Sequence, residues 1–153
     1  MTESTQKILF RPMRIDDLAQ IVAIEKDATP SPWSAKQFQQ SLEQDHCVVI
    51  CDAHSIVGYA ILSTVLDQAE VLNICISPEH QGGGLGSRLL AGVLKQLSDE
   101  IEIVFLEVRV SNFRAIHLYL NQGFVEVGQR RGYYPTEFGR EDAILMKLLR
   151  RRD

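Results

Sequence analysis

Four glycines lie close together in the segment Gln81-Gly82-Gly83-Gly84-Leu85-Gly86-Ser87. The run before it, residues 71–76, is short, apolar and partly β-branched, as in a strand, and the run after it carries leucines at helical spacing. Glycine permits a positive φ and lets backbone N–H groups approach a ligand, and the start of a helix carries partial positive charge. The segment therefore indicates a site that binds an anion such as a phosphate group.

Two familiar phosphate-binding loops fit these residues poorly. The P-loop ends in Gly-Lys-Ser or Gly-Lys-Thr, whereas Leu85-Gly86-Ser87 contains no lysine. The dinucleotide-binding fingerprint has Gly-x-Gly-x-x-Gly after the first strand of a βαβ unit, a spacing that residues 82–86 do not match. A flexible turn from strand to helix, without a ligand, stays open as the simplest alternative.

A single carboxylate, Glu107, interrupts the apolar run 103–110. Burial of a carboxylate is costly unless the group is paired. One interpretation is an ion pair with Arg109, which shares a strand face with Glu107, and another is a solvated strand end. The third interpretation is catalytic, because a carboxylate held in an apolar setting can serve as a general base near neutral pH.

The segment 112–124 predicts a helix that Asn112 can cap and Gly123 can close. Tyr119 shares a face of that helix with Ala115, so it could be an ordinary core aromatic. We interpret His80, beside the glycine loop, and His117, on another helix face, as structural or solvated.

These motifs resemble those of the GNAT superfamily of N-acetyltransferases. Gln81, Gly84 and Gly86 match its Gln/Arg-x-x-Gly-x-Gly/Ala signature, and residues 112–124 are similar to its Asn-x-x-Ala-x-x-Leu-Tyr-x-x-x-Gly-Phe segment. The resemblance implies that acetyl-CoA binds with its pyrophosphate on the glycine loop and that no metal is needed. It also implies that Glu107 is the catalytic base and that Tyr119 protonates the departing thiolate. The residues implied to bind acetyl-CoA are Ile74, Cys75, Ile76, Gly82, Gly83, Gly84, Leu85, Gly86, Ser87 and Asn112.

Shorter segments are similar to the RimI-type ribosomal-protein-alanine N-acetyltransferase branch of that superfamily. They are Pro32-Trp33-Ser34, Arg130-Arg131-Gly132-Tyr133-Tyr134-Pro135 and Gly139-Arg140-Glu141-Asp142-Ala143. The resemblance implies a peptide groove lined by Trp33, Tyr133, Tyr134 and Glu141, and a ribosomal protein N-terminus as substrate, namely the alanine of the eighteenth small-subunit protein. A polar hairpin with aromatic packing, a lysine- or small-amine-directed enzyme, and a non-catalytic acyl-CoA-binding module are the alternatives.

Two departures from the family pattern concern the same sites. Many relatives carry a basic or long polar side chain at the positions of Gly82, Gly83 and Ser87, so this chain leaves phosphate binding mostly to backbone amides. Gly132 likewise replaces a larger residue in the segment implied to line the groove.

Length and composition narrow the class of protein. A chain of 153 residues, 45% hydrophobic, suits one domain over residues 1–153. The net charge of −4, with one basic cluster at 150–152, disfavours nucleic-acid binding, and no run suggests a membrane span or a signal peptide. We expect a cytoplasmic protein, and nothing in the sequence indicates its oligomeric state.

Three cysteines, Cys47, Cys51 and Cys75, occur in apolar runs. Their odd number favours reduced thiols over disulfides. Cys47 and Cys51 with His46 or His54 lack the usual spacing of a metal site.

The apolar periodicity predicts an α/β (α+β) fold with a mixed central sheet of about seven strands and about four helices on its two faces. The resemblance implies the GNAT fold for the same order of elements. The expected strands are 9–10, 46–52, 56–65, 70–76, 102–110, 124–127 and 143–149, and the expected helices are 15–28, one that Ser34 caps, 84–97 and 112–121.

Overall fold

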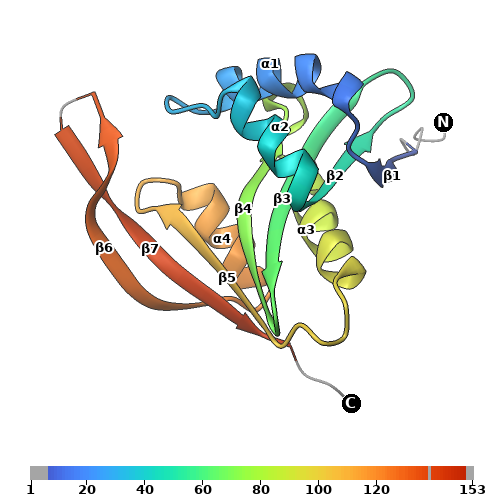
Figure 1. Cartoon of the computed structure of the whole chain (residues 1–153). Helices are drawn as coiled ribbons and strands as arrows, with labels where there is room; N and C mark the ends of the chain where they lie inside the picture. The colour runs from blue at the N-terminus through green and yellow to red at the C-terminus, as the bar shows by residue number, and fades with distance from the viewer. Residues whose placement is uncertain (1–6, 138, 151–153) are drawn as a thin grey trace, which may run out of the picture.

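The computed structural model describes residues 7–137 and 139–150 (Figure 1). Arg151 and Arg152 of the basic cluster lie outside the described residues. The elements are β1 (Leu9–Pro12), the 3₁₀ turn η1 (Ile15–Asp17), α1 (Leu18–Ala28), α2 (Ala35–Gln44), β2 (His46–Cys51), β3 (Ile56–Val65), β4 (Gln68–Ile76), the 3₁₀ turn η2 (Pro78–His80), α3 (Leu85–Gln96), β5 (Ile103–Arg109), α4 (Phe113–Asn121), β6 (Val125–Thr136) and β7 (Gly139–Leu149).

The strands form one seven-stranded sheet in the order β1-β2-β3-β4-β5-β7-β6. Within the described residues β4 and β5 pair in parallel, and every other neighbouring pair is antiparallel. The sheet is therefore mixed, and the predicted fold class is confirmed. No helix in the part of the chain that the structure describes is long and apolar enough to cross a membrane.

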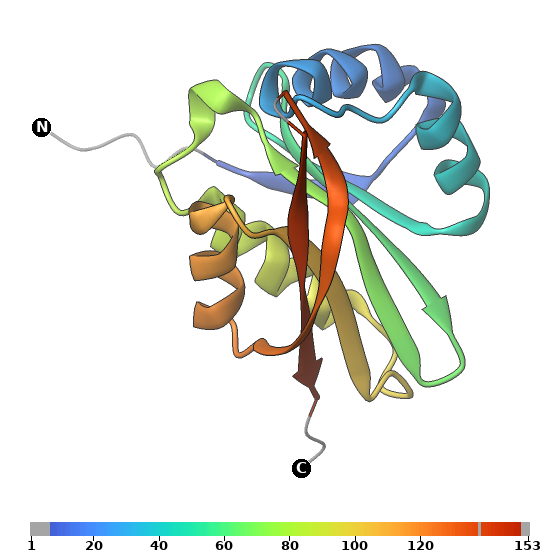
Figure 2. The ribbon, with the colours of Figure 1, turned by 90° about the vertical axis from the view of Figure 1, so that its left-hand side faces the viewer.

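Helices cover both faces of this sheet, as Figure 2 shows. On one face Ile21 of α1 and Phe38 of α2 pack with Tyr59 of β3 in one buried cluster. On the other face Leu89 of α3 and Tyr119 of α4 belong to a second buried cluster. The second cluster includes the α3 residues at helical spacing that the sequence singled out, because an amphipathic helix turns its apolar stripe toward the sheet.

Two predicted helix caps are present. The Ser34 hydroxyl accepts a hydrogen bond from the Gln37 N–H at 3.2 Å, and the Gln37 side chain accepts one from the Ser34 N–H at 2.8 Å. This reciprocal capping box satisfies two backbone donors at the start of α2. At the start of α4 the Asn112 side chain accepts a hydrogen bond from the Ala115 N–H at 3.2 Å. Gly123, with φ of +103°, follows α4 as predicted.

The β6–β7 hairpin is longer than the sequence predicted. We expected strands at 124–127 and 143–149, but β6 continues to Thr136 and β7 begins at Gly139. The added part of β6 is mostly exposed and polar, so it shows no apolar alternation. Pairing with β7 makes it a strand, and register shifts interrupt that pairing between Glu126 and Gly128 and between Arg130 and Tyr134.

The two central strands part after a short stretch of pairing. Residues 68–71 of β4 pair with residues 103–106 of β5, whereas β4 stays paired with β3 up to Ile76. Asn73 and Val71 oppose the successive β3 residues Ile61 and Leu62, so Leu72 between them is an extra residue in β4. Such a β-bulge bends a strand and increases its twist, and here it lies where β4 leaves β5.

An ion pair ties β1 to the turn before α1. Both carboxylate oxygens of the buried Asp17 accept hydrogen bonds from the Arg11 guanidinium, each at 2.8 Å. Asp17 Oδ2 also accepts one from the Arg14 N–H at 2.7 Å. The hydrogen bonds from Arg11 hold the pKa of Asp17 below its usual value.

Because the folded state has the lower pKa, Asp17 stabilises the fold above its unfolded pKa of about 3.9, and this contribution is lost as the pH falls through the folded pKa. Asp17→Asn should therefore lower the free energy of unfolding at neutral pH by about 1–3 kcal/mol. The difference from wild type should shrink below about pH 4. Urea denaturation at neutral and acidic pH measures both effects, with Asp16→Asn, at an exposed position, as the control. Equal stability of Asp17→Asn and wild type at neutral pH would contradict the assignment.

Candidate active site

A cleft of about 800 Å³ lies where β4 and β5 part. Its walls come from β4 residues 71–76, β5 residues 107–109, one side of α4, and parts of the glycine loop and of the segment between α1 and α2. Segments that are far apart in the sequence, and that carry the glycine, carboxylate and tyrosine motifs, thus meet at one site.

The glycine loop has the open backbone surface that an anion requires. Gly82 and Gly84 have φ of +89° and +83°, where an L side chain would be strained. A Cβ built on Gly82, Gly83 or Gly84 would meet no atom within 4 Å, so the loop is open to a ligand. Gly84 is the N-cap of α3. These residues fit a phosphate group held by backbone amides at a helix start.

Gly86 has a different role from the three glycines before it. A Cβ at this position would lie 3.4 Å from the Leu118 side chain of α4. That distance is an ordinary van der Waals contact, so Gly86 lies beside α4 at the edge of the cleft and is not part of the open backbone surface. Leu85 and Gly83 face an adjoining hollow of about 390 Å³, which Arg88 also lines.

Glu107 lines the cleft, and its side chain is 19% exposed. The alternative interpretation, an ion pair between Glu107 and Arg109, is wrong. Glu107 Oε1 lies 3.3 Å from Nε of Arg130 in β6, and Arg109 Nη1 lies 3.0 Å from Glu141 Oε1. The β6–β7 hairpin determines these two ion pairs. Arg109 of β5 and Arg130 of β6 both lie opposite Ala143 of β7. This register brings Arg130 of β6 to Glu107 of β5, and Glu141 of β7 to Arg109 of β5.

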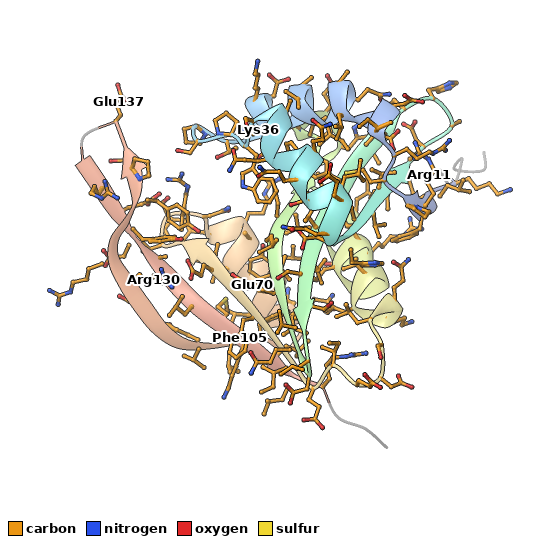
Figure 3. The ribbon with its side chains drawn as sticks, in the orientation of Figure 1. Arg11, Lys36, Glu70, Phe105, Arg130 and Glu137 are labelled. Atoms are coloured by element: carbon orange, nitrogen blue, oxygen red, sulfur yellow. The ribbon has the colours of Figure 1, made fainter. Side chains whose placement is uncertain are left out.

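A second carboxylate lies near Glu107. Burial raises the pKa of Glu70 in β4, and the negative charge of Glu107 raises it further. Figure 3 shows Glu70 and Phe105 on the neighbouring strands β4 and β5, with Arg130 on β6 beyond β7. Glu70 does not line the cleft, but it is close enough to Glu107 for the charge of one to influence the other. Of the two, only Glu107 was singled out as a base.

Tyr119 is 6% exposed and contacts the cleft. Its ring packs edge to face on Phe124, with 5.8 Å between the centroids. Burial raises the pKa of its phenol, so the group keeps its proton at neutral pH and can act as an acid rather than a base. Asn112 lines the same cleft while it caps α4.

The β4 residues Ile74, Cys75 and Ile76 line the cleft beyond the bulge. Burial raises the pKa of the Cys75 thiol to about 11, so it is an inert neutral group at neutral pH. Cys47, Cys51 and Cys75 are all free thiols. Residues 7–137 and 139–150 contain no group of three or more His, Cys, Asp or Glu side chains that could hold a metal ion.

The residues implied to line a peptide groove fall into two sets. Trp33 and Tyr134 line the cleft, and the Arg109 guanidinium lies 4.5 Å from the centroid of the Tyr134 ring. Tyr133 and Glu141 lie beside it, Tyr133 with its ring 4.9 Å from the Arg130 guanidinium and Glu141 in its ion pair with Arg109. The far end of the β6–β7 hairpin and the segment between α1 and α2 lie at the same end of the molecule (Figure 1).

Glu25 of α1 is a cleft residue that the sequence analysis missed. Its side chain accepts hydrogen bonds from the Tyr59 hydroxyl at 2.6 Å, from Asn73 Nδ2 at 3.2 Å and from the Trp33 N–H at 3.0 Å, while the residue is 4% exposed. It thereby joins α1 to β3, to the bulged part of β4 and to the Trp33 segment. The sequence signal that could have identified Glu25 is its position four residues after the buried Ile21, which places it on the apolar face of the helix.

Comparisons with known proteins identify the class of protein to which this fold belongs. The fold is that of an acyl-CoA-dependent N-acetyltransferase. Residues 18–124 match the model of the Acetyltransferase (GNAT) family, and the chain belongs to that family.

Curated relatives are similar over most of their length. The chain is 40% identical over 134 residues to the ribosomal protein bS18-alanine N-acetyltransferase of Escherichia coli K12, covering 86% of this chain and 90% of the relative. It is 38% identical over 133 residues to the enzyme of the same name from Haemophilus influenzae, covering 85% and 90%.

Solved structures are similar over almost the whole chain. The crystal structure of the Escherichia coli ribosomal-protein-S18-alanine N-acetyltransferase has a TM-score of 0.90 and 36% identity, with 96% of both chains covered. Arabidopsis thaliana NAA60 in complex with acetyl-CoA has the same fold, with a TM-score of 0.83 and 21% identity over 94% of this chain and 98% of that one.

Glu25 should hold the Trp33 segment in place. Glu25→Gln keeps the size of the side chain but puts an amide NH₂ among three donors, so we expect the free energy of unfolding to fall by about 1–3 kcal/mol. Trp33 is the one tryptophan in the chain, so intrinsic fluorescence reports on this segment alone. We expect a red-shifted emission under native conditions, because Trp33 gains contact with water.

Glu43→Gln is the matched control for Glu25→Gln, since Glu43 is exposed on α2. It should leave both the emission and the unfolding curve unchanged. If Glu25→Gln retained the wild-type emission maximum, Glu25 would not position the Trp33 segment.

Proposed function

We propose that this chain transfers the acetyl group of acetyl-CoA to the N-terminal α-amine of a protein, with the N-terminal alanine of ribosomal protein bS18 as its substrate. The observation that carries the proposal is the cleft, in which an open glycine loop, Glu107 and Tyr119 meet. The names and the 40% identity of the curated relatives support the choice of substrate. A ribosomal substrate also supports a cytoplasmic location.

Acetyl-CoA supplies an acetyl thioester to this reaction. In the proposal the backbone amides of residues 82–87 hold its pyrophosphate, and Ile74, Cys75, Ile76 and Asn112 contact the rest of the molecule. Residues 72–76 of β4 have left β5, so backbone groups on that edge of the strand can bind a ligand. A backbone N–H there would polarise the thioester carbonyl and stabilise the negative charge that develops on its oxygen.

Glu107 and Tyr119 each carry out one of the two proton transfers in the proposed reaction. The neutral amine attacks the thioester carbonyl carbon, the C–S bond breaks, and Glu107 accepts the proton that the amine nitrogen loses, directly or through a water. Tyr119 gives its proton to the departing sulfur, which is a poor leaving group as a thiolate of pKa about 8.5 unless it is protonated. The raised pKa of Tyr119 keeps that proton available at neutral pH.

The chemistry of the nucleophile favours an N-terminus. An α-amine has a pKa of about 7.7–8.0, against about 10.4 for lysine, so a larger neutral fraction is present at physiological pH. Acidic residues would attract a basic ribosomal segment, and the candidates are Asp67, Glu70, Glu137, Glu141 and Asp142. The charge of Glu141 is matched by Arg109 of β5, whereas Asp142 accepts a hydrogen bond from the neutral Gly132 N–H. Glu70, Glu137 and Asp142 are therefore better candidates than Glu141, and Figure 3 labels the first two.

Substitution of the proposed base and acid tests the mechanism. Glu107→Gln should lower kcat by about 10²–10⁴-fold, the usual contribution of a general base, with an altered pH profile. Tyr119→Phe should slow release of the thiol without a change in the dissociation constant of acetyl-CoA. Stopped-flow and steady-state assays, with calorimetry for binding, measure these values.

Glu70→Gln is the matched control for the base, because Glu70 is the neighbouring carboxylate. Its kcat should stay within about fivefold of wild type, since it holds no proton-transfer role in this mechanism. A large loss of kcat in Glu70→Gln with normal turnover in Glu107→Gln would move the base to Glu70. Full activity of both Glu107→Gln and Tyr119→Phe would make these residues structural.

Acetylation of two defined peptides tests the identity of the substrate. A peptide that begins with free alanine followed by basic residues should be acetylated on its α-amine, as mass spectrometry of the fragments would show. The same peptide with a blocked N-terminus and free lysines should react poorly, because lysine is mostly protonated. Added salt should raise KM, since the attraction between exposed charges is screened beyond about 8–10 Å at physiological ionic strength and over shorter distances at higher salt. Preferential lysine acetylation of the blocked peptide would favour the lysine-directed alternative.

A further inference from the structure

The glycine loop has no charge of its own for a pyrophosphate. From Gln81 to Ser87 the chain contains no lysine or arginine. Backbone amides can orient phosphate oxygens, but the amides are neutral and the pyrophosphate is an anion that leaves water when it binds. A cation from another element would offset that cost.

Two arginines line the cleft within the described residues, Arg109 and Arg114. Arg109 is already neutralised by Glu141, 3.0 Å away, and stacks on Tyr134. Arg114 of α4 instead donates a hydrogen bond to a neutral amide, with 3.0 Å between its Nη1 and Gln81 Oε1. The charge of Arg114 is thus not cancelled by the partner that holds it.

Gln81 fixes the Arg114 side chain beside the loop. The Nε2 of Gln81 donates a hydrogen bond to the Ile76 carbonyl at the end of β4, with a distance of 3.0 Å. Gln81 directly precedes Gly82, the first glycine with positive φ. The guanidinium therefore stands next to the backbone surface that is open to an anion.

The position of Arg114 in its helix supports a role in binding. It is the second residue of α4, where the positive end of the helix dipole disfavours a cation. An exposed arginine at this point does not stabilise the helix, whereas a bound anion would interact favourably with both the guanidinium and the helix end.

We propose that Arg114, held by Gln81, is the cationic ligand of the acetyl-CoA pyrophosphate and replaces the basic side chains that the glycine loop lacks. This inference rests on the proposed function, because it assumes that acetyl-CoA is the substrate. A guanidinium has five N–H donors, so the bond to Gln81 leaves enough of them for a two-point contact with phosphate oxygens. Arg114 is thus a binding residue and takes no part in proton transfer.

Calorimetry with CoA and 3′-dephospho-CoA tests the inference, because both contain the pyrophosphate and only CoA has the 3′-phosphate. Arg114→Gln should raise the dissociation constants of both by the same factor, about 5- to 20-fold, since a charge-assisted contact is lost. Arg114→Lys keeps the charge and should lose less. Lys36→Gln, which removes one positive charge at an exposed position on α2, should bind both as wild type does (Figure 3).

The salt dependence of binding gives a second readout. The dissociation constant of CoA should rise less steeply with salt in Arg114→Gln than in wild type, because one screened charge contact is gone. Thermal unfolding should match wild type, since Arg114 is exposed.

Wild-type affinity of Arg114→Gln for both ligands would overturn the inference and leave the proposed function intact. Weakened binding of CoA alone, with unchanged binding of 3′-dephospho-CoA, would also overturn it, because Arg114 would then contact the 3′-phosphate. If the wild-type protein bound neither ligand, the proposed function itself would fail, and this inference with it.

Discussion

The parting of β4 from β5 is the constraint on which the rest of the site depends. A strand inside a sheet uses its backbone N–H and C=O groups on both neighbours, so a fully paired β4 would have none left for a ligand. Here β4 pairs with β5 over residues 68–71 only, and the extra residue Leu72 lies at the point of separation. Residues 72–76 thereby become a wall of the cleft while β3 still supports them on the other side.

The two helical layers hold the two ends of this opening. On one face Glu25 joins α1 to Tyr59, to Asn73 beyond the bulge and to the segment of Trp33. On the other face α3 and α4 share one buried apolar cluster, to which Leu89 of α3 and Tyr119 of α4 belong. Each helix pair thus stabilises the sheet through an apolar cluster and places polar groups at the cleft edge. The same contacts serve the fold and the site.

Charges around the cleft are organised mainly by the β6–β7 hairpin. Arg130 pairs with Glu107, and Glu141 pairs with Arg109, so two charged residues of β5 are matched by residues of β6 and β7. Glu70 of β4 is close enough to these charges for Glu107 to raise its pKa and for Arg130 to lower it. Arg114 stands apart from these pairs, beside the glycine loop.

By itself the sequence determined the local structure and the class of protein. Some signals act within a few residues, so their effects could be predicted: the glycines between 82 and 86, the caps Ser34 and Asn112, and the apolar period of β3 and α3. The family resemblance is confirmed by the match over residues 18–124. The full length of β6, the partner of Glu107 and the contacts of Glu25 could not be predicted from the sequence. The extra length of β6 depends on its pairing with β7 across the hairpin, and the other two depend on residues far apart in the chain, such as Glu107 with Arg130 and Glu25 with Asn73. Only strand register and the bulge at Leu72 bring such residues together, because pairing geometry rather than residue type decides which side chains meet across a sheet.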